Sequence, residues 1–423
     1  MDFYDLDLND NTLDALDAMN FTTCTPVQEK CIPEILNGRD VLGVAQTGTG
    51  KTAAYLLPVL SMLDDGQCTF PDGRTALFPH DAINCVVMSP TRELAQQIDQ
   101  AMQGFAYYMP GVSSIAVYGG NDGSRYDQEY KGLQLGADVV IATPGRLKSH
   151  ISMGNVDLGR TSFFILDEAD RMLDMGFSDD ILSIARLLPP TCQTIMFSAT
   201  MPAKIEQLAK TLLKDPAIVK IAVSKPVEKI HQQAYVCHET QKTKIIRHLF
   251  KLGQLRRVII FSCSKLKVKD ITRELRQMNI NADQMHSDLS QQERDDVMYR
   301  FKTGQVDVLV ATDIVARGID IDDIAIVINY DVPRDSEDYV HRIGRTARAE
   351  REGRAITLVR GWDITYFMQI ENFLGYTVEK VPLPNGMNGP EYKVMNKRGG
   401  RAVFHKHGKK DNKKRQVKRK SEK

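Results

Sequence analysis

The 423-residue sequence lacks the signals of a secreted, zinc-binding or membrane-spanning protein. Its seven cysteines are scattered and form no C-x-x-C pair, so neither a disulfide framework nor a zinc site is expected. No apolar run approaches the roughly 18 residues that a membrane helix requires. The acidic N-terminus lacks the basic start and apolar core of a signal peptide. We therefore expect a cytoplasmic protein with reduced thiols and no membrane partner.

Net charge is also nearly absent, at +1, but this total conceals an asymmetry along the chain. From Lys397 to Lys423 there are 13 Lys and Arg against two acids, so this segment carries +11. The rest of the chain holds 42 bases and 52 acids, or −10. A basic segment beside an acidic body is typical of proteins that contact nucleic acid.

Short apolar runs recur along the chain in two series, and 423 residues suffice for two or three domains. Stretches between them, such as Thr52–Leu63 and Arg92–Phe105, have the apolar spacing of helices. The runs that we interpret as buried strands are Val41–Val44, Ile83–Met88, Ile115–Val117, Val139–Ala142, Phe163–Leu166 and Thr194–Phe197, then Gln233–Cys237, Val258–Phe261, Asp283–Met285, Val308–Ala311, Ile324–Asn329 and Ala355–Val359. Strands that alternate with helices predict a parallel sheet covered on both faces.

The fold class is therefore α/β, with two such units in tandem. The predicted boundaries are residues 1–222 for a first domain, 223–229 for a linker, 230–385 for a second domain and 386–423 for a basic tail. The tail has too little apolar surface to offset the entropy of ordering it, so it is predicted to be disordered.

The segment Ala45–Thr52 has the composition of a phosphate-binding loop, although it begins with Ala where the general pattern has Gly. It follows a predicted strand and precedes a helix, and its glycines let backbone N–H groups turn toward phosphate oxygens. Lys51 would meet the β- and γ-phosphates, and the Thr52 hydroxyl would hold Mg²⁺. Such loops also arise by chance. The residues expected to bind nucleotide are Ala45, Gln46, Thr47, Gly48, Thr49, Gly50, Lys51 and Thr52.

Two carboxylates follow the apolar run Phe163–Leu166 directly. Asp167 is placed to hold Mg²⁺ through water, because Mg²⁺ keeps much of its hydration. Glu168 is the group expected to orient and deprotonate the attacking water. A solvated acidic turn is the alternative, but two acids at the mouth of a sheet that bears a phosphate loop argue against it.

The sequence D-E-A-D at Asp167–Asp170 is the motif that names the DEAD-box RNA helicases, and the chain resembles that family from Phe3 to Arg348. The first half also carries Phe21 with Pro26 and Gln28, A-Q-T-G-T-G-K-T at Ala45–Thr52, P-T-R-E-L-A at Pro90–Ala95, Gly119-Gly120, T-P-G-R at Thr143–Arg146 and S-A-T at Ser198–Thr200. The second half carries Phe261-Ser262, Q-Q-E-R at Gln291–Arg294, A-T-D-I-V-A-R-G-I-D at Ala311–Asp320 and H-R-I-G-R-T-A-R at His341–Arg348. Two departures are Ala347, where many members have Gly, and a Gly/Pro-bearing stretch between Asp64 and Asn84 that predicts an enlarged loop. The arrangement of two domains followed by a short basic extension is similar to that of bacterial members of the family.

The resemblance implies two RecA-like domains that clamp ATP and Mg²⁺ between them. The residues that match the family's adenine and nucleotide contacts are Phe3, Phe21, Gln28 and Asp313. The residues that match its RNA contacts are Pro90, Thr91, Arg92, Gly119, Gly120, Thr143 and Arg146, with Thr312 and Arg317 in the second domain. Hydroxyls, guanidinium groups and close backbone approach suit phosphates and 2′-hydroxyls.

Arg345 and Arg348 resemble arginine fingers that reach the γ-phosphate from the second domain. The catalytic set that the resemblance implies is Lys51, Asp167, Glu168, Arg345 and Arg348. The residues expected to couple nucleotide state to domain closure are Asp170, Ser198, Thr200 and His341. These roles come from the family and not from spacing.

The function that these observations predict is ATP-dependent unwinding of short RNA duplexes, or remodelling of RNA–protein complexes. A DNA-directed translocase, a non-catalytic RNA clamp and a small-molecule P-loop kinase are the alternatives; the last leaves the second domain unexplained. Expected partners are single-stranded and short duplex RNA, with ribosomal or RNA-degradation assemblies as candidates, and a monomer is expected. For the tail, an RNA tether competes with a solubility or import segment.

Overall fold

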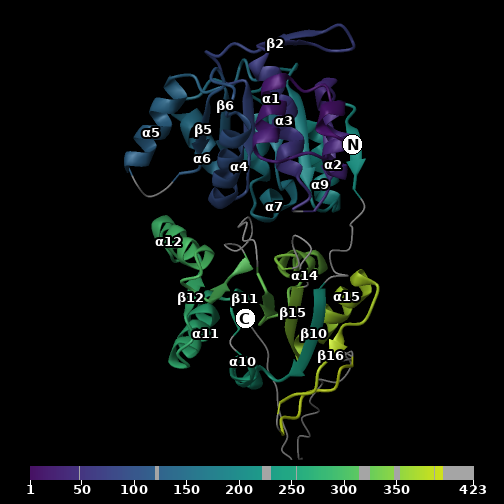
Figure 1. Cartoon of the computed structure of the whole chain (residues 1–423), viewed down its shortest axis with the longest axis vertical. Coiled ribbons are helices and arrows are strands. Elements are labelled where there is room, and N and C mark those ends of the chain that lie inside the picture. The colour runs from purple at the N-terminus through teal and green to yellow at the C-terminus, as the bar shows by residue number, and fades with distance from the viewer. Residues whose placement is uncertain are drawn as a thin grey trace, which may run out of the picture.

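Two parallel sheets, one in each half of the chain, organise the molecule (Figure 1). The computed structural model describes residues 1–46, 48–119, 123–221, 230–253, 255–313, 324–346, 353–384 and 386–393; of these, the side chains of 123–125 and 337 are outside the description. The predicted fold class, two tandem α/β units with parallel sheets, is confirmed. The predicted linker and most of the predicted tail lie outside the described residues.

The first sheet has seven strands in the order β5-β6-β4-β7-β8-β1-β9, all parallel to their neighbours. Their bounds are β1 Val41–Val44, β4 Cys85–Met88, β5 Ser114–Val117, β6 Val139–Ala142, β7 Phe163–Leu166, β8 Gln193–Ser198 and β9 Ala217–Lys220. The helices of this unit are η1 Phe3–Asp5, α1 Asp10–Ala18, α2 Pro26–Leu36, α3 Lys51–Asp64, α4 Arg92–Phe105, α5 Gly123–Gln134, α6 Pro144–Ser152, α7 Ala169–Asp174, α8 Ser178–Ala185 and α9 Ala203–Leu212.

The second sheet also has seven parallel strands, in the order β12-β13-β11-β14-β15-β10-β16. Their bounds are β10 Ile230–Cys237, β11 Val258–Phe261, β12 Ala282–Met285, β13 Val308–Ala311, β14 Ile326–Asn329, β15 Gly353–Arg360 and β16 Glu379–Lys380. The helices described here are η3 Glu239–Gln241, α10 Lys242–Leu252, α11 Lys265–Gln277, α12 Gln291–Lys302, α14 Ser336–Ile343, η4 Gly361–Asp363 and α15 Ile364–Leu374. Numbered by position in their own unit, the strands of both sheets run third, fourth, second, fifth, sixth, first, seventh.

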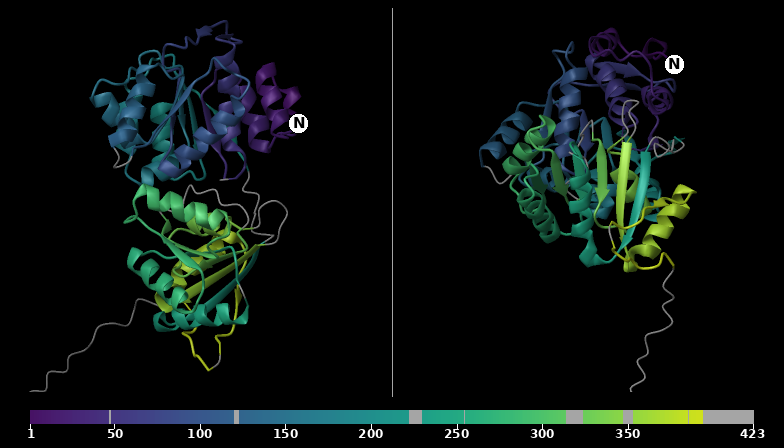
Figure 2. Two further views of the ribbon diagram at one scale, coloured as in Figure 1. Left: turned by 60° about the vertical axis from the view of Figure 1, so that its left-hand side comes forward. Right: turned by 60° about the horizontal axis from the view of Figure 1, so that its bottom comes forward.

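Alternation along each central strand explains why both sheet faces are covered. In β7, Phe163 and Ile165 join one apolar core, whereas Phe164 and Leu166 join a second core on the opposite face. Successive strand side chains point to opposite faces, so a continuous apolar run supplies both layers. Figure 2 shows helices on both sides of each sheet.

Four strands were not predicted from the sequence. Strand β9 extends the first sheet beyond β1, and the two-residue β16 extends the second beyond β10. Between Asp64 and Asn84, where the sequence predicted an enlarged loop, the chain forms a hairpin of β2 (Gln67–Thr69) and β3 (Thr75–Leu77). Phe70, in the turn between these two strands, and Phe78, which follows β3, are both buried in the first core. The two residues of β16 are too few for an apolar pattern to stand out.

Packing continues beyond Gly386, where the sequence predicted the tail to begin. Met387 contacts the apolar core around β11, and Tyr392 contacts the core beside α15. Among the helices that the structure describes, none is long and apolar enough to cross a membrane.

Candidate functional site

The loop after β1 is held in a curled form by its neighbours. Gly48 and Gly50 have φ values of +82° and +89°, which glycine adopts without strain. The Gln28 amide donates to the Gly50 carbonyl at 3.1 Å, and a Cβ on Gly50 would lie 2.5 Å from that amide nitrogen. The predicted adenine-motif glutamine therefore fixes the phosphate loop directly, and position 50 requires glycine.

Lys51 is the first residue of α3 and lies at the centre of this site. Its side chain is 5% exposed, and its ammonium has no hydrogen-bond partner among the described residues. An unpaired buried charge is costly, so the position calls for an anion from outside the chain. The N-terminal end of α3 favours the same charge.

The two carboxylates after β7 are buried beside Lys51. Asp167 accepts a hydrogen bond from the Tyr55 hydroxyl at 3.0 Å and another from the Glu168 backbone N–H at 2.9 Å. Glu168 has φ +51°, a conformation that is uncommon outside glycine. Burial raises the pKa of the Glu168 carboxyl above its usual range, against the opposing effect of Lys51. A buried carboxyl with a raised pKa suits a general base.

The remaining acid of the D-E-A-D segment connects to the S-A-T loop. Asp170 accepts hydrogen bonds from the backbone N–H groups of Ala199 and Thr200, both at 3.1 Å. The Ser198 hydroxyl donates to the Thr200 carbonyl at 2.7 Å, so it shapes the loop and does not contact Asp170. The predicted link between the two segments thus runs through backbone groups.

Contacts between the two units converge on the residue that follows D-E-A-D. Arg171 forms an ion pair with Asp338 of α14 at 2.9 Å and a hydrogen bond with His341. These residues border a cavity of about 450 Å³ between α7, α9 and α14. A second contact joins Glu93 of α4 to Gln291 and Arg294 of α12, at 3.5 and 3.4 Å.

Arg345 brings a second cation to the nucleotide side of the site. It is 7% exposed and lies near enough to Glu168 to lower the pKa of that carboxyl, against the effect of burial. Asp313 pairs with Arg342, whose guanidinium nitrogens lie 2.5 and 2.6 Å from its two oxygens, and its expected contact with the nucleotide stays a prediction. Arg348 lies outside the described residues.

The aromatic residues of the expected adenine site differ in exposure. Phe21 is 43% exposed and lies 6.3 Å from Phe105, ring centre to ring centre. Phe3 is 2% exposed and packs in the first apolar core. Its expected contact with the nucleotide stays a prediction.

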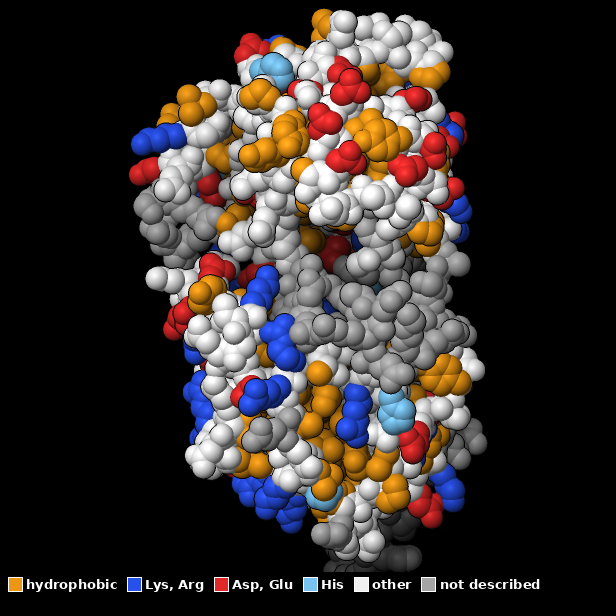
Figure 3. All heavy atoms as spheres, viewed as in Figure 1, with side chains coloured by type: hydrophobic (Ala, Val, Ile, Leu, Met, Phe, Trp, Pro, Cys, Tyr) orange, Lys and Arg blue, Asp and Glu red, His pale blue; other side chains and the backbone are white. Residues whose placement is uncertain are grey.

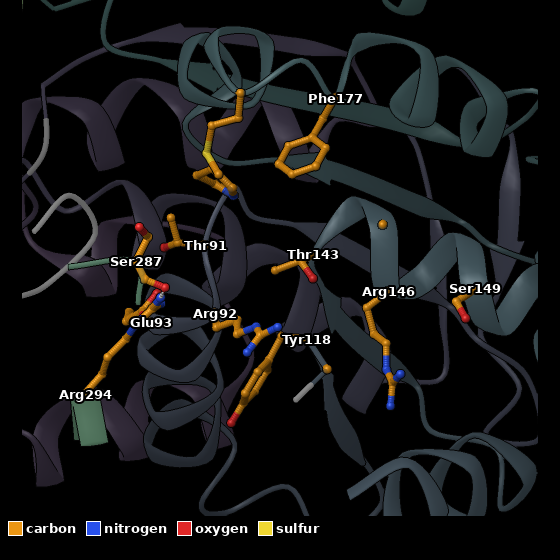
Figure 4. Close-up of a pocket in the computed structure, with 14 residues that line it drawn as sticks. Thr91, Arg92, Glu93, Tyr118, Thr143, Arg146, Ser149, Phe177, Ser287 and Arg294 are labelled. Carbon is orange, nitrogen blue, oxygen red and sulfur yellow. Dashed lines mark hydrogen bonds and ion pairs between the residues drawn. The ribbon is translucent and has the colours of Figure 1, made fainter. Parts of the chain in front are cut away.

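A cavity of about 530 Å³ lies on the other side of the junction (Figure 4). Six of the nine residues predicted to bind RNA line it: Pro90, Thr91, Arg92, Gly119, Thr143 and Arg146. Figure 4 shows Arg92 beside Tyr118, with Arg294 entering from the second unit. Thr312 is not among the lining residues, and Gly120 and Arg317, like Thr47 of the phosphate loop, lie outside the described residues.

Glu129 organises one wall of this cavity and was not predicted from the sequence. Its carboxylate, 2% exposed, accepts from the Gly119 N–H at 3.0 Å and from Arg146 Nε at 2.6 Å, and it contacts His150 at 3.0 Å. The Arg146 guanidinium also lies over the Tyr126 ring, 4.9 Å from its centre. No local motif marks Glu129, because its partners come from other segments of the chain.

Comparisons with known proteins agree with this geometry. The DEAD/DEAH box helicase family model matches residues 25–208, and the helicase conserved C-terminal domain model matches residues 241–350. ATP-dependent RNA helicase DeaD of Haemophilus influenzae is 40% identical over 90% of this chain and 60% of its own length. ATP-dependent RNA helicase CshA of Listeria monocytogenes is 38% identical over 87% of this chain and 68% of its own.

A solved structure of S. cerevisiae Dbp5, bound to RNA and ADP BeF3, superposes with a TM-score of 0.77 at 29% identity, covering 90% of this chain and 95% of that one. This chain spans about 60% of the length of the DeaD relatives. The two family models, the strand order and the residues around Lys51 lead to the same conclusion: the chain belongs to the DEAD/DEAH box helicase family.

Proposed function

We propose that this chain is an ATP-dependent RNA helicase, in which RNA-gated ATP hydrolysis and domain closure unwind short duplexes or remodel RNA–protein complexes. The observation that carries the proposal is the buried Lys51 ammonium, which lies near two buried carboxylates and has no hydrogen-bond partner in the part of the chain that the structure describes. The β- and γ-phosphates of ATP would supply the missing anion. The relatives' names and the ligands of the Dbp5 structure support the same assignment.

The residues around Lys51 also fit a magnesium ion. Asp167 offers a buried carboxylate and Thr52 a hydroxyl at the start of α3. One or two such groups together with substrate phosphates are the donor set that Mg²⁺ uses, because it retains several waters. When bound, the ion would neutralise charge on the phosphate oxygens.

Hydrolysis is assigned to Glu168 with help from the second unit. Its carboxylate would orient the attacking water and accept its proton. Arg345, buried near Glu168, would stabilise the charge that builds on the transferring phosphate, and Arg348 is proposed to act with it. Gln28 would contact the adenine base of the nucleotide, and Phe21 would lie beside that base.

RNA is proposed to bind in the cavity between Thr91, Arg92, Thr143 and Arg146. These groups read phosphates and 2′-hydroxyls and not base edges, which suits a helicase that acts without sequence preference. Glu129 would position Arg146 by its hydrogen bond to Nε.

Domain closure links the two sites. Asp170 holds the S-A-T loop, and the neighbouring Arg171 pairs with Asp338 and His341 of the second unit. ATP and RNA both lie across the junction, so each ligand favours the closed form and strengthens the binding of the other. A cytoplasmic location, a monomeric state and any ribosomal or RNA-degradation partner remain predictions.

The proposal is tested by ATP turnover with and without single-stranded RNA, beside a single-stranded DNA arm and a Glu168→Gln variant. We expect RNA, but not DNA, to stimulate ATP turnover strongly. Glu168→Gln should lower the RNA-stimulated turnover about 10²–10⁴-fold, because the general base is lost. Equal stimulation by DNA would instead indicate a DNA-directed translocase. RNA binding without any turnover would indicate a passive clamp.

A further inference from the structure

A tyrosine hydroxyl lies among the groups expected to hold the magnesium ion. Tyr55 belongs to α3, four residues after Lys51, and its side chain is fully buried. Its hydroxyl donates a hydrogen bond to Oδ2 of Asp167 at 3.0 Å. The Thr52 hydroxyl lies near the same phenol oxygen. Residues three and four apart are neighbours on a helix, so α3 itself brings Tyr55 to both expected magnesium ligands.

Hydrogen bonds reach both oxygens of the Asp167 carboxylate. Oδ1 accepts from the Glu168 backbone N–H at 2.9 Å, and Oδ2 accepts from Tyr55. The first donor belongs to the next residue, so it does not fix the carboxylate relative to α3. The second donor is 112 positions away in the sequence, on the helix that follows the phosphate loop. Carboxylate oxygens have lone pairs for more than one partner, so both bonds leave room for a metal-bound water.

Packing in the first apolar core fixes the Tyr55 ring. The ring lies 5.7 Å from that of Phe197, centre to centre, at an interplanar angle of 46°. Phe197 is itself fully buried, and a Cβ on Gly43 would lie 2.2 Å from its ring, so this ring packs directly against β1. Close packing on this scale leaves a side chain little freedom. The Tyr55 hydroxyl therefore has a defined position at Asp167.

The second unit has no hydroxyl at the matching position. Four residues after Lys242, which begins α10, stands Ile246, 3% exposed. Asp331 follows the fifth strand of its unit, as Asp167 does, and lies 2.9 Å from the Lys242 ammonium. Among the described residues, Asp167 forms no such hydrogen bond with Lys51. Of the two aspartates, the one with a tyrosine partner is the one that does not pair with its lysine.

We propose that Tyr55 is a positioning residue for Mg²⁺: it holds the Asp167 carboxylate toward the metal and the phosphates and away from a direct pair with Lys51. Groups that hydrogen-bond a ligating carboxylate orient it, and losing one typically weakens metal binding about 10–100-fold. Tyr55 is fully buried, so it acts through Asp167. This inference rests on the proposed function, because the ion enters the site with the nucleotide.

A purely structural role is the competing interpretation of Tyr55. A buried tyrosine usually finds a partner for its hydroxyl, whatever the site does. A structural role predicts a change in stability alone. The positioning role predicts a change in how strongly nucleotide binding depends on Mg²⁺, and the two interpretations differ in that measurement.

Mg²⁺ binding is measured most selectively through the nucleotide. Figure 3 shows Asp and Glu side chains over the visible face of the first unit, and exposed carboxylates attract divalent cations without forming a site. We would therefore titrate the full chain, without RNA, with a fluorescent non-hydrolysable ATP analogue at a series of free Mg²⁺ concentrations and in EDTA. The ratio of the affinities with and without Mg²⁺ gives the coupling between ion and nucleotide.

Tyr55→Phe removes the hydroxyl and keeps the ring. The free Mg²⁺ concentration that gives half of the affinity gain should rise about tenfold, the lower end of the range for groups that orient metal ligands. Nucleotide affinity in EDTA should not change. RNA-stimulated ATP turnover should need more Mg²⁺ by the same factor and recover at saturating Mg²⁺.

Tyr339→Phe is the matched control. Tyr339 is also fully buried, and its hydroxyl donates to Gln232 at 2.9 Å in the second unit. This variant loses a hydrogen bond of the same kind and should keep the Mg²⁺ dependence of the unmodified chain. Urea unfolding midpoints of both variants separate a loss of stability from a loss of Mg²⁺ affinity.

A double variant tests whether Tyr55 acts through Asp167. Asp167→Asn should bind the nucleotide with little dependence on Mg²⁺, and adding Tyr55→Phe should change nothing further, because residues that act as one unit are not additive. Three results would overturn the inference: an unchanged Mg²⁺ requirement in Tyr55→Phe, an equal shift in Tyr339→Phe, or a further shift in the double variant. Failure of the proposed function would appear separately, as ATP turnover that RNA does not stimulate.

Discussion

The two sheets have the same strand order, yet the lysine at the equivalent position has different hydrogen-bond partners in the two units. In each unit the helix after the first strand begins with a buried lysine: Lys51 in α3 and Lys242 in α10. Among the described residues, Lys51 has no hydrogen-bond partner. Lys242, which is fully buried, lies 2.9 Å from Asp331 and 3.3 Å from Glu239. The second unit thus pairs its lysine directly with carboxylates, whereas the carboxylates near Lys51 form no described hydrogen bond with it.

The carboxylates that follow the fifth strand explain the difference. In the second unit Asp331 reaches Lys242 and also accepts from the Ser262 hydroxyl at 2.7 Å. In the first unit Asp167 accepts a hydrogen bond from the Tyr55 hydroxyl at 3.0 Å and forms no described hydrogen bond with Lys51. A shared topology therefore leaves the lysine able to bind a ligand only in the unit whose carboxylates do not pair with it directly.

The largest predicted effect concerns the cation that the second unit does contribute to the first unit's site. Arg345→Ala should lower RNA-stimulated ATP turnover by about 10³–10⁵-fold, because the arginine that stabilises the negative charge of the transition state would be missing. Nucleotide affinity without RNA should change little. Turnover assays beside an Arg273→Ala control, an exposed arginine on α11, would measure this. A loss of less than tenfold would show that Arg345 has no such role.

The second prediction tests the two lysines through stability. Asp331→Asn should destabilise the second unit by about 3–5 kcal/mol, because Lys242 would be left buried without its main partner. Lys51→Met, which removes a charge that already lacks a partner, should leave stability unchanged or slightly raised. Urea unfolding without nucleotide measures both. Equal destabilisation by the two changes would contradict the comparison.

Measuring unfolding stability at low pH tests the pairing of Lys242 with Asp331 more sharply. Burial alone favours the neutral acid, but Lys242 and its neighbours hold the pKa of the Asp331 carboxyl well below its usual range. A lowered native pKa gives stability that is present above the unfolded value of about 3.9 and is lost as pH falls toward the native value. The stability of the second unit should therefore decline below about pH 4. Asp331→Asn should lack this component of the decline.

The smallest predicted effect concerns the contact between the units. Arg171→Asp should weaken the coupling between ATP and RNA binding by about 5- to 150-fold, the range of typical coupling free energies. Asp338→Arg alone should act in the same direction, and the double exchange should restore part of the coupling. RNA affinity measured with and without a non-hydrolysable ATP analogue gives the coupling directly. No recovery in the double variant would mean that the ion pair is incidental.

Much of the fold could be predicted from residues that act locally. The apolar run Phe163–Leu166 coincides with β7, and Arg92–Phe105 coincides with α4. Thr91 caps α4 by accepting from the Leu94 N–H at 3.2 Å. Such elements depend on periodicity and capping within a dozen residues, so they can be read from the sequence. The edge strands β9 and β16 could not, because pairing with distant strands defines them.

The candidate site likewise has a part that a short sequence segment determines and a part that depends on contacts between distant segments. The sequence by itself determined the phosphate loop and the carboxylates after β7, because each lies in one short segment with a fixed relation to a strand end. Only the tertiary structure decided which charges are directly paired: Glu129 with Arg146 and Asp331 with Lys242, whereas Lys51 has no hydrogen-bond partner among the described residues. Compensation depends on distances between segments far apart in the chain, and the energy of a buried charge depends on those distances.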